Sequence, residues 1–264
     1  MCVFDLTRYP FSEEIYKLNL KTYQNNRCCP SFRMLSGGKK ILAAKPEVVA
    51  YLALYSVHHI AKMDRAISVL DKNMISNTDI EIYDWGCGQA LATLALLEGF
   101  RNAGIMLKKI QSINLVDASS ISLQYAIDYV NQYYGSLGIG TPEINYYKMN
   151  FNRDYENPIS INSDTTKIHL FSNILDVLYF EVEKLADLIK KTISGNNIFV
   201  CISPDYSASS LGFMLFENSL QKKYKLERIS RESNQITATF YSVVNHRFEI
   251  NTVKSLQSIF TINA

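Results

Sequence analysis

The sequence has no apolar run long enough to cross a membrane. Its longest apolar stretch, Val48 to Val57, is far shorter than the roughly 20 residues that a spanning helix needs. The N-terminal residues carry charge at Asp5 and Arg8 and lack the apolar segment of a secretory signal. There is also no internal repeat and no low-complexity segment. We therefore expect a globular protein of the cytoplasm without a membrane partner.

Cysteine is scarce and follows no known pattern. The five cysteines are an odd number, and none of them forms a CxxC pair. The adjacent Cys28 and Cys29 suit neither a zinc knuckle nor a disulfide framework. His58 and His59, also adjacent, lack the spacing of metal ligands. The sequence therefore predicts reduced thiols and no metal site.

A strong excess of one charge is also missing. With 27 Lys and Arg against 25 Asp and Glu, the net charge is +2, which does not indicate a strongly basic nucleic-acid binder. The charge is unevenly spread, since residues 1–78 carry +5 and residues 79–264 carry −3. Either this is ordinary scatter, or the basic front slightly favours an anionic or RNA partner.

The chain changes character near residue 78. Before it, the pattern favours helices at Phe11 to Asn25, with Ser12 as N-cap, at Glu47 to Met63 and at Asp64 to Leu70. After it, short apolar runs alternate with amphipathic ones. We therefore expect two domains, a helical N-terminal cap at 1–78 and an α/β domain at 79–264.

In the second domain, strands and helices alternate at the spacing of βαβ units. The expected strands are 80–83, 112–116, 144–149, 167–171 and 197–202, and the expected helices are 91–100, 121–134, 182–193 and 208–220. This alternation predicts a doubly wound, mostly parallel sheet. Three more strands, at 224–229, 236–244 and 247–253, follow with short turns. They fit an antiparallel C-terminal edge.

A glycine-containing loop follows the first of these strands. It begins at Asp84 and includes Gly86, Cys87 and Gly88, directly before a helix. Glycines there let the backbone turn tightly and approach a ligand at the carboxyl end of the strand. A dinucleotide fingerprint needs a third glycine, but Leu91 stands in its place. An acid before the first glycine also disfavours an anionic pyrophosphate.

The Asp-x-Gly-x-Gly loop resembles the first motif of S-adenosylmethionine (SAM)-dependent methyltransferases of the Rossmann-like class I. Later strand ends agree with this resemblance: Asp117, Asn150, and Ser172 with Asn173. The resemblance implies a Rossmann-like, doubly wound, mostly parallel seven-stranded sheet. It also implies SAM as cofactor.

The resemblance further implies a role for each residue of the site. Gly86 and Gly88 line the methionine part of SAM, and Asp84 orders the loop and reaches the amino group through water. Asp117 accepts both ribose hydroxyls, Ala118 and Ser119 flank the adenine, and Asn150 binds the adenine amino group. Ser172 and Asn173 border the transferred methyl group, and Cys87 and Phe151 complete the cofactor-binding set. Structural alternatives stay open. Asp84 could cap the turn, Asp117 could be the N-cap of the next helix, and Asn150 could serve only a turn.

The sequence lacks the usual catalytic signatures. The Asn/Asp-Pro-Pro-Tyr/Phe motif of amino-methylating relatives is absent, since Ser172 to Asp176 stands there. Cys201 lies among strand residues, which disfavours a covalent route. No GxSxG, HExxH or Walker motif occurs. Asp176 stays a weak candidate for catalysis.

One face of the expected helix after residue 46 offers other candidates. Tyr51, Tyr55, His58 or His59, and Lys62 recur at steps of three or four residues. Together with Lys39 and Lys40, this face either lines the acceptor pocket or packs in the core. A histidine there could act as general base, so His58, His59 and Tyr55 are the catalytic candidates.

The function that these patterns favour is methyl transfer from SAM to an unidentified small molecule, RNA or protein. The alternative is a methyltransferase-like binding or assembly protein without turnover, since fold alone does not separate the two. A nucleotide-dependent oxidoreductase is disfavoured by the missing third glycine.

Overall fold

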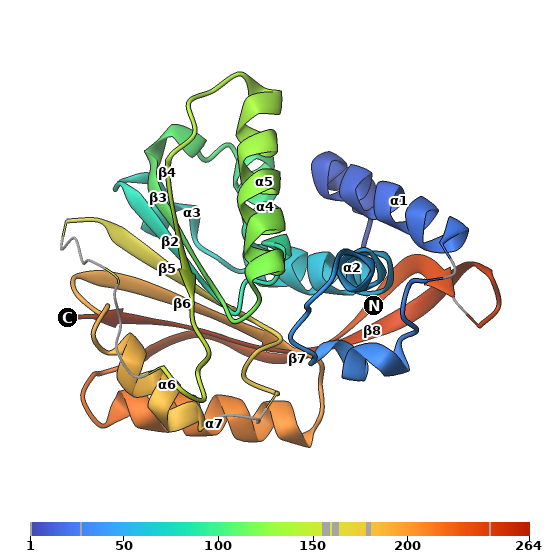
Figure 1. The fold of residues 1–264 in the computed structure, drawn as a ribbon. Helices are drawn as coiled ribbons and strands as arrows, with labels where there is room; N and C mark the ends of the chain where they lie inside the picture. The colour runs from blue at the N-terminus through green and yellow to red at the C-terminus, as the bar shows by residue number, and fades with distance from the viewer. Residues whose placement is uncertain (1, 27, 155–158, 160–163, 178–180, 243) are drawn as a thin grey trace.

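The computed structural model describes residues 2–26, 28–154, 159, 164–177, 181–242 and 244–264. Its centre is one mixed sheet with helices on both faces (Figure 1). The strands are β1 (Cys2–Val3), β2 (Ile80–Trp85), β3 (Ile110–Asp117), β4 (Glu143–Lys148), β5 (Thr166–Ser172), β6 (Asn196–Ser203), β7 (Glu227–Ser242) and β8 (Arg247–Asn263). The α-helices are α1 (Pro10–Asn25), α2 (Lys45–Ile67), α3 (Lys72–Ser76), α4 (Leu91–Asn102), α5 (Ser120–Leu137), α6 (Val182–Ile189) and α7 (Ser207–Gln221). Short 3-10 turns are η1 (Leu6–Arg8), η2 (Arg33–Gly38) and η3 (Leu107–Lys109).

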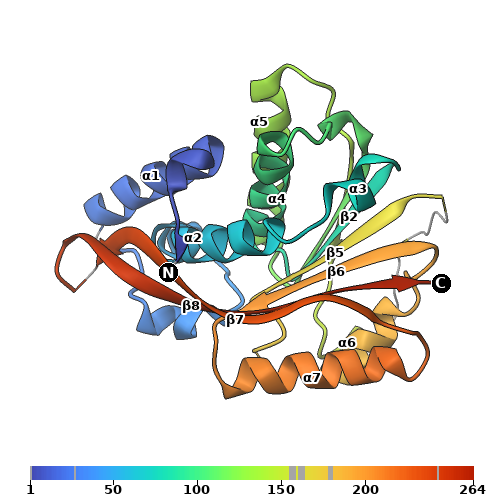
Figure 2. The same ribbon diagram turned by 180° about the vertical axis from the view of Figure 1, so that it is seen from behind.

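The sheet has the doubly wound topology that the sequence predicts. Its strand order is β1-β7-β8-β6-β5-β2-β3-β4, and β2 to β6 run parallel. Helices α4 and α5 cover one face, and α6 and α7 cover the other (Figures 1 and 2). Because both faces are covered, every residue of β2 is buried, as expected of a central parallel strand. The Rossmann-like α/β fold class with an antiparallel C-terminal edge is confirmed.

The edge of the sheet differs from the expectation in two ways. The two-residue β1 pairs in parallel with β7 and adds a strand to the expected seven. The expected strands 224–229 and 236–244 are wrong as separate strands, because they form one long β7 that passes through a bulge between Arg228 and Ser230. The polar residues 230–235 resemble a turn in sequence. In the structure they pair with β8 and keep the strand continuous.

The N-terminal helices also differ in their ends. The helix expected at 64–70 is wrong, because α2 continues to Ile67 and the next helix is the short α3. Ser12 is not an N-cap, since α1 already begins at Pro10. Its hydroxyl instead bonds Glu98 of α4. Helices α1, α2 and α4 share one apolar core with the sheet, and the division at residue 78 stays a prediction.

Glu98 fastens α1 to α4. Its buried carboxylate accepts the backbone N–H of Phe11 at 2.9 Å and that of Ser12 at 3.1 Å. We expect Glu98→Ala to lower the free energy of unfolding by roughly 1.5–3 kcal/mol, because it leaves two N–H groups at a helix start without their charged acceptor. Urea titration measures this, with the exposed Glu183→Ala as control. Equal stability of both variants would contradict the role of Glu98.

Candidate functional site

The loop between β2 and α4 turns sharply at the carboxyl edge of the sheet. Gly86 and Cys87 both donate their backbone N–H to the carbonyl of Val116, at 2.8 and 2.9 Å. Gly86 and Gly88 have positive φ angles of 74° and 52°, which glycine adopts at little cost. A side chain at Gly86 would also place its Cβ 2.9 Å from Ile174. The loop therefore lies directly between the ends of β3 and β5.

Asp117 holds this loop from the end of β3. One carboxylate oxygen accepts the N–H of Gly88 at 2.9 Å, and the other accepts that of Ser119 at 2.7 Å. Burial raises the pKa of Asp117, and these backbone hydrogen bonds oppose the rise. Each carboxylate oxygen has two lone pairs, so both oxygens can accept a further bond from a ligand. Asp117 is not the N-cap of α5, because Ser119 takes that position.

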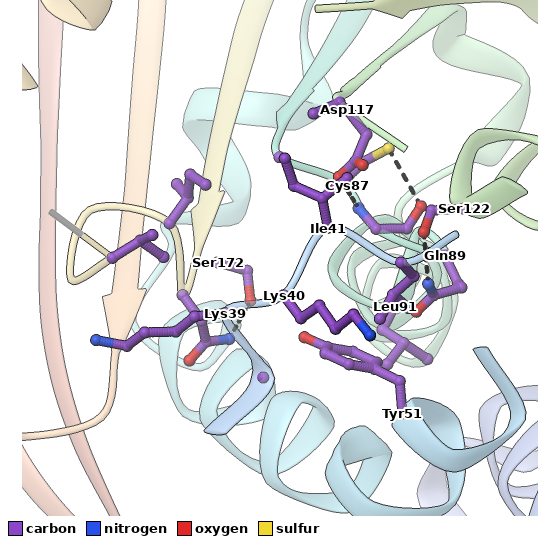
Figure 3. A pocket seen from close by; sticks show the side chains of 18 of the residues that line it. Lys39, Lys40, Ile41, Tyr51, Cys87, Gln89, Leu91, Asp117, Ser122 and Ser172 are labelled. Atoms are coloured by element: carbon purple, nitrogen blue, oxygen red, sulfur yellow. Dashed lines mark hydrogen bonds between the residues drawn. The ribbon is translucent and has the colours of Figure 1, made fainter. Parts of the chain in front are cut away.

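A cavity of about 200 Å³ opens at these strand ends (Figure 3). Figure 3 shows Asp117 and Cys87 near one end of it, Ser172 and Lys39 near the other, and Tyr51 of α2 below. Its lining is Gly38, Lys39, Lys40, Ile41, Leu42, Tyr51, His59, Gly86, Cys87, Gly88, Gln89, Leu91, Ala92, Asp117, Ala118, Ser122, Met149, Asn150, Phe151, Asn152, Ser172, Asn173, Ile174 and Val177. The cavity thus unites the ends of four strands with the start of α4 and the face of α2.

Most residues that the sequence singles out as cofactor-binding lie in this lining. They are Gly86, Cys87, Gly88, Asp117, Ala118, Asn150, Phe151, Ser172 and Asn173. Asp84 and Ser119 lie outside it. The hydroxyl of Ser119 makes two hydrogen bonds to the backbone: it donates to the carbonyl of Leu42 at 2.6 Å and accepts the N–H of Ser122 at 3.1 Å.

Asp84 is a buried support of the loop. Its side chain is fully buried, and one oxygen accepts the hydroxyl of Thr93 on α4 at 2.7 Å. The other oxygen has no hydrogen-bond partner among the residues that the structure describes. Desolvation raises the pKa of Asp84 to about 7. The carboxyl group therefore joins β2 to α4 from inside the fold.

Asn150 serves a turn and also lines the cavity. Its side-chain oxygen accepts the N–H of Asn152 at 3.0 Å, and its own N–H donates to Asp154 at 2.7 Å. The side-chain amide N–H₂ is the part that could meet a ligand. Asn150 can therefore stabilise the turn and bind a ligand at the same time.

His59 is the histidine of α2 that faces the cavity. Its Nδ1 lies 2.8 Å from the Asn173 amide nitrogen, and its Nε2 lies 3.1 Å from the Tyr51 hydroxyl. The other side of the Asn173 amide, Oδ1, accepts a hydrogen bond from Lys62. Burial and the charge of Lys62 hold the pKa of His59 well below its usual range, so the ring is neutral.

The other catalytic candidates lie outside the cavity lining. His58 packs edge-on against Phe240 of β7, and burial lowers its pKa to about 4. Tyr55 stacks on Phe32 and makes a tilted ring contact with Tyr51. Asp176 accepts the hydroxyl of Ser203 at 3.0 Å and is buried. Of the candidates His58, His59, Tyr55 and Asp176, only His59 lines the cavity.

The segment 38–42 forms part of the lining, although the sequence indicated only its lysines. Ser36 and Gly37 have positive φ angles of 52° and 64° and turn the chain toward α2. A Cβ at Gly38 would lie 3.3 Å from the ring of Tyr55. The Ser-Gly-Gly run was the available signal. A run of this kind predicts a break between helices, but it does not show which cavity the following residues line.

The two buried cysteines near the sheet do not have the properties of nucleophiles. Burial raises the pKa of Cys87 and of Cys201 well above the usual thiol value. Both therefore stay protonated at neutral pH. Across the described residues, no cluster of His, Cys, Asp and Glu could hold a metal ion. In the same part of the chain, no helix is long and apolar enough to span a membrane.

Among known proteins, the chain is similar to several solved structures. No protein-family model matches the sequence, and no curated protein sequence matches it. The chain is similar to precorrin-6Y C5,15-methyltransferase of Geobacter metallireducens, with 10% identity, a TM-score of 0.47, and coverage of 76% of this chain and 86% of that one. It is also similar to a SAM-dependent methyltransferase of Aquifex aeolicus, with 12% identity, a TM-score of 0.44, and coverage of 78% of this chain and 93% of that one.

A third similar structure contains the product of the cofactor. It is the plantazolicin methyltransferase in complex with S-adenosylhomocysteine (SAH), with 11% identity, a TM-score of 0.43, and coverage of 96% of this chain and 98% of that one. The solved structures that the chain resembles therefore include SAM-dependent methyltransferases, and their substrates differ.

Proposed function

We propose that the protein is a SAM-dependent methyltransferase and that the cavity at the strand ends holds SAM. The observation that carries this proposal is Asp117, a carboxylate at the end of β3 that holds the N–H of Gly88 and lines the cavity. A carboxylate there suits a ribose, because its oxygens can accept two hydroxyl hydrogen bonds.

The rest of the cavity suits the other parts of SAM. Helix α4 begins at Leu91 in the lining, and its N-terminal end favours the carboxylate of the methionine part. Met149 and Phe151 supply apolar surface for the adenine, and the side-chain amide of Asn150 could bind its polar edge. Ser172 and Asn173 then border the methyl group. Bound SAM would supply the electrophilic methyl, while these residues hold and orient it.

The charge near the cavity bears on the acceptor. Lys39 and Lys40 both line it. Lys40 is paired with Glu47, whereas Lys39 donates to the backbone carbonyl of Asp176 at 3.2 Å. An anionic acceptor, including RNA, is favoured by the cation of Lys39.

Turnover is tested with methyl-labelled SAM. The purified protein is incubated with extract separated into small-molecule, protein and RNA fractions, and labelled products are counted. Label in one fraction, lost with Asp117→Ala, would support the transferase and identify its acceptor class. The alternative, a binding or assembly protein without turnover, is favoured by the engagement of both His59 ring nitrogens. SAM binding without label in any fraction would support that alternative.

The Asp117 contact leads to a quantitative prediction. We expect Asp117→Ala to weaken SAH binding by roughly 1.5–3 kcal/mol, the range for hydrogen bonds to a charged group. Calorimetric titration measures it. Asp128→Ala, at an exposed position of α5, is the matched control and should bind SAH as the unchanged protein does. A folded Asp117→Ala protein with full affinity would remove Asp117 from the site.

A further inference from the structure

Four polar side chains form a continuous chain of contacts beside the cavity. Lys62 donates to Oδ1 of Asn173, and Nδ2 of Asn173 lies 2.8 Å from Nδ1 of His59. Nε2 of His59 lies 3.1 Å from the hydroxyl of Tyr51. Lys62 is 3% exposed, so the chain begins at a buried amine. Tyr51, His59 and Asn173 line the cavity, whereas Lys62 is outside the lining.

The chemistry of the donors fixes the direction of every hydrogen bond. An ammonium group only donates, so the carbonyl side of the Asn173 amide must face Lys62. The N–H₂ side then faces His59, whose Nδ1 must accept. A neutral imidazole with Nδ1 as acceptor carries its proton on Nε2. That proton is donated to the oxygen of Tyr51, which leaves the proton of the Tyr51 hydroxyl available to the cavity.

The backbone stabilises the same arrangement. Asn173 directly follows β5 and has a positive φ of 58°, and its N–H donates to the carbonyl of Ile202 at 2.8 Å. Asparagine tolerates this left-handed conformation better than most residues. The Asn173 N–H₂ also donates to the hydroxyl of Ser172 at 3.0 Å. Asn173 is therefore held at both its backbone and its side chain.

We propose that His59 is a positioning residue that presents the Tyr51 hydroxyl to the methyl acceptor as a hydrogen-bond donor, and that the reacting group of the acceptor is a carboxylate. This inference rests on the proposed function. It differs from the expectation that a histidine of α2 is a general base, because neither ring nitrogen of His59 is free to take a proton.

A carboxylate acceptor balances the reaction without a base. One of its oxygens forms a bond to the methyl carbon, the bond from carbon to sulfur breaks, and its electron pair stays on sulfur. The products are a methyl ester and SAH, and no proton moves. An alcohol would have to lose a proton. Among the described lining residues, the carboxylate is Asp117, which lies at the opposite end of the cavity from Ser172 and is assigned to the ribose by the proposed function.

The tautomer of His59 is the direct test, and it needs no acceptor. We expect nitrogen-15 NMR of the SAH complex at pH 7 to show His59 protonated on Nε2 and not on Nδ1. Replacing the buried amine in Lys62→Met should release Asn173 and give a mixture of tautomers, which a purely structural role of Lys62 would not produce. Lys17→Met, on the surface of α1, should leave the tautomer unchanged. An Nδ1-protonated ring in the unchanged protein would overturn the proposal.

Acetate tests the acceptor class, because it is small enough to enter the cavity whatever the rest of the acceptor looks like. In the SAH complex, acetate should shift the His59 Nε2 resonance, and ethanol and an equal ionic strength of chloride should not. Tyr51→Phe, which keeps the ring but removes the hydroxyl, should abolish the acetate shift in its own SAH-saturated complex. No shift with acetate would overturn the carboxylate assignment. If the unchanged protein does not bind SAH, that result would instead contradict the proposed function.

Discussion

Replacing Gly88 by leucine should abolish detectable SAM and SAH binding while the protein stays folded. A Cβ at Gly88 meets no atom within 4 Å, and Gly88 lines the cavity, so a larger side chain would fill the ligand space. The backbone cost of a non-glycine residue at φ 52° is about 1–2 kcal/mol. Ala90 and Asn173 already adopt similar angles, so the fold tolerates this conformation.

Gly138→Leu is the matched control for this variant. Gly138 ends α5 with a φ of 64°, is exposed, and also has open space at its Cβ position. It therefore has the same backbone strain but lies outside the cavity lining. Calorimetry on both variants should show no binding by Gly88→Leu and ordinary binding by Gly138→Leu. Tight SAH binding by a folded Gly88→Leu protein would show that the ligand lies elsewhere.

Because of Asp84, the free energy of unfolding of the protein should fall as the pH rises from about 4 to above 7. Burial raises the pKa of this carboxyl to about 7 in the folded protein, whereas it is about 3.9 in an unfolded chain. Between these values the folded state binds the extra proton, so the free energy of unfolding falls with rising pH. Three pKa units correspond to about 4 kcal/mol from this one group.

Asp84→Asn isolates this effect. The amide oxygen can still accept the hydroxyl of Thr93, but the side chain no longer titrates. The free energy of unfolding of the variant, minus that of the unchanged protein, should rise by up to about 4 kcal/mol between pH 4 and pH 8. Urea titration of both proteins at each pH measures this difference. The exposed Asp128→Asn should show a flat difference. A flat difference for Asp84→Asn as well would mean that Asp84 is ionised in the folded protein.

The sequence was informative where residues close in the chain act together. The loop from Gly86 to Gly88 and the acid at Asp117 follow apolar strands directly, and parallel strands bring their carboxyl ends to one edge. That rule alone predicts that distant residues such as Ser172 and Asp117 approach the same cavity. The fold class follows from the same alternation of strands and helices.

Contacts across the fold could not be predicted in this way. The sequence placed Tyr51, His58 or His59 and Lys62 on one face but could not choose between the histidines, because the choice depends on how α2 packs against β7 and β5. Gly86 gives a similar case. The sequence explained this glycine by the close approach of a ligand, but in the structure a Cβ at Gly86 would lie only 2.9 Å from the side chain of Ile174, on a distant loop. Such contacts depend on packing that no local pattern encodes.

The most direct test of the account is a parallel calorimetric titration of the protein with SAM, SAH and NADH. We expect binding of SAM and SAH, with no binding of NADH, because the loop lacks the third glycine of a dinucleotide site and has Leu91 in its place. Binding of NADH, or no binding of SAM and SAH, would contradict the central claim that this cavity is a SAM site.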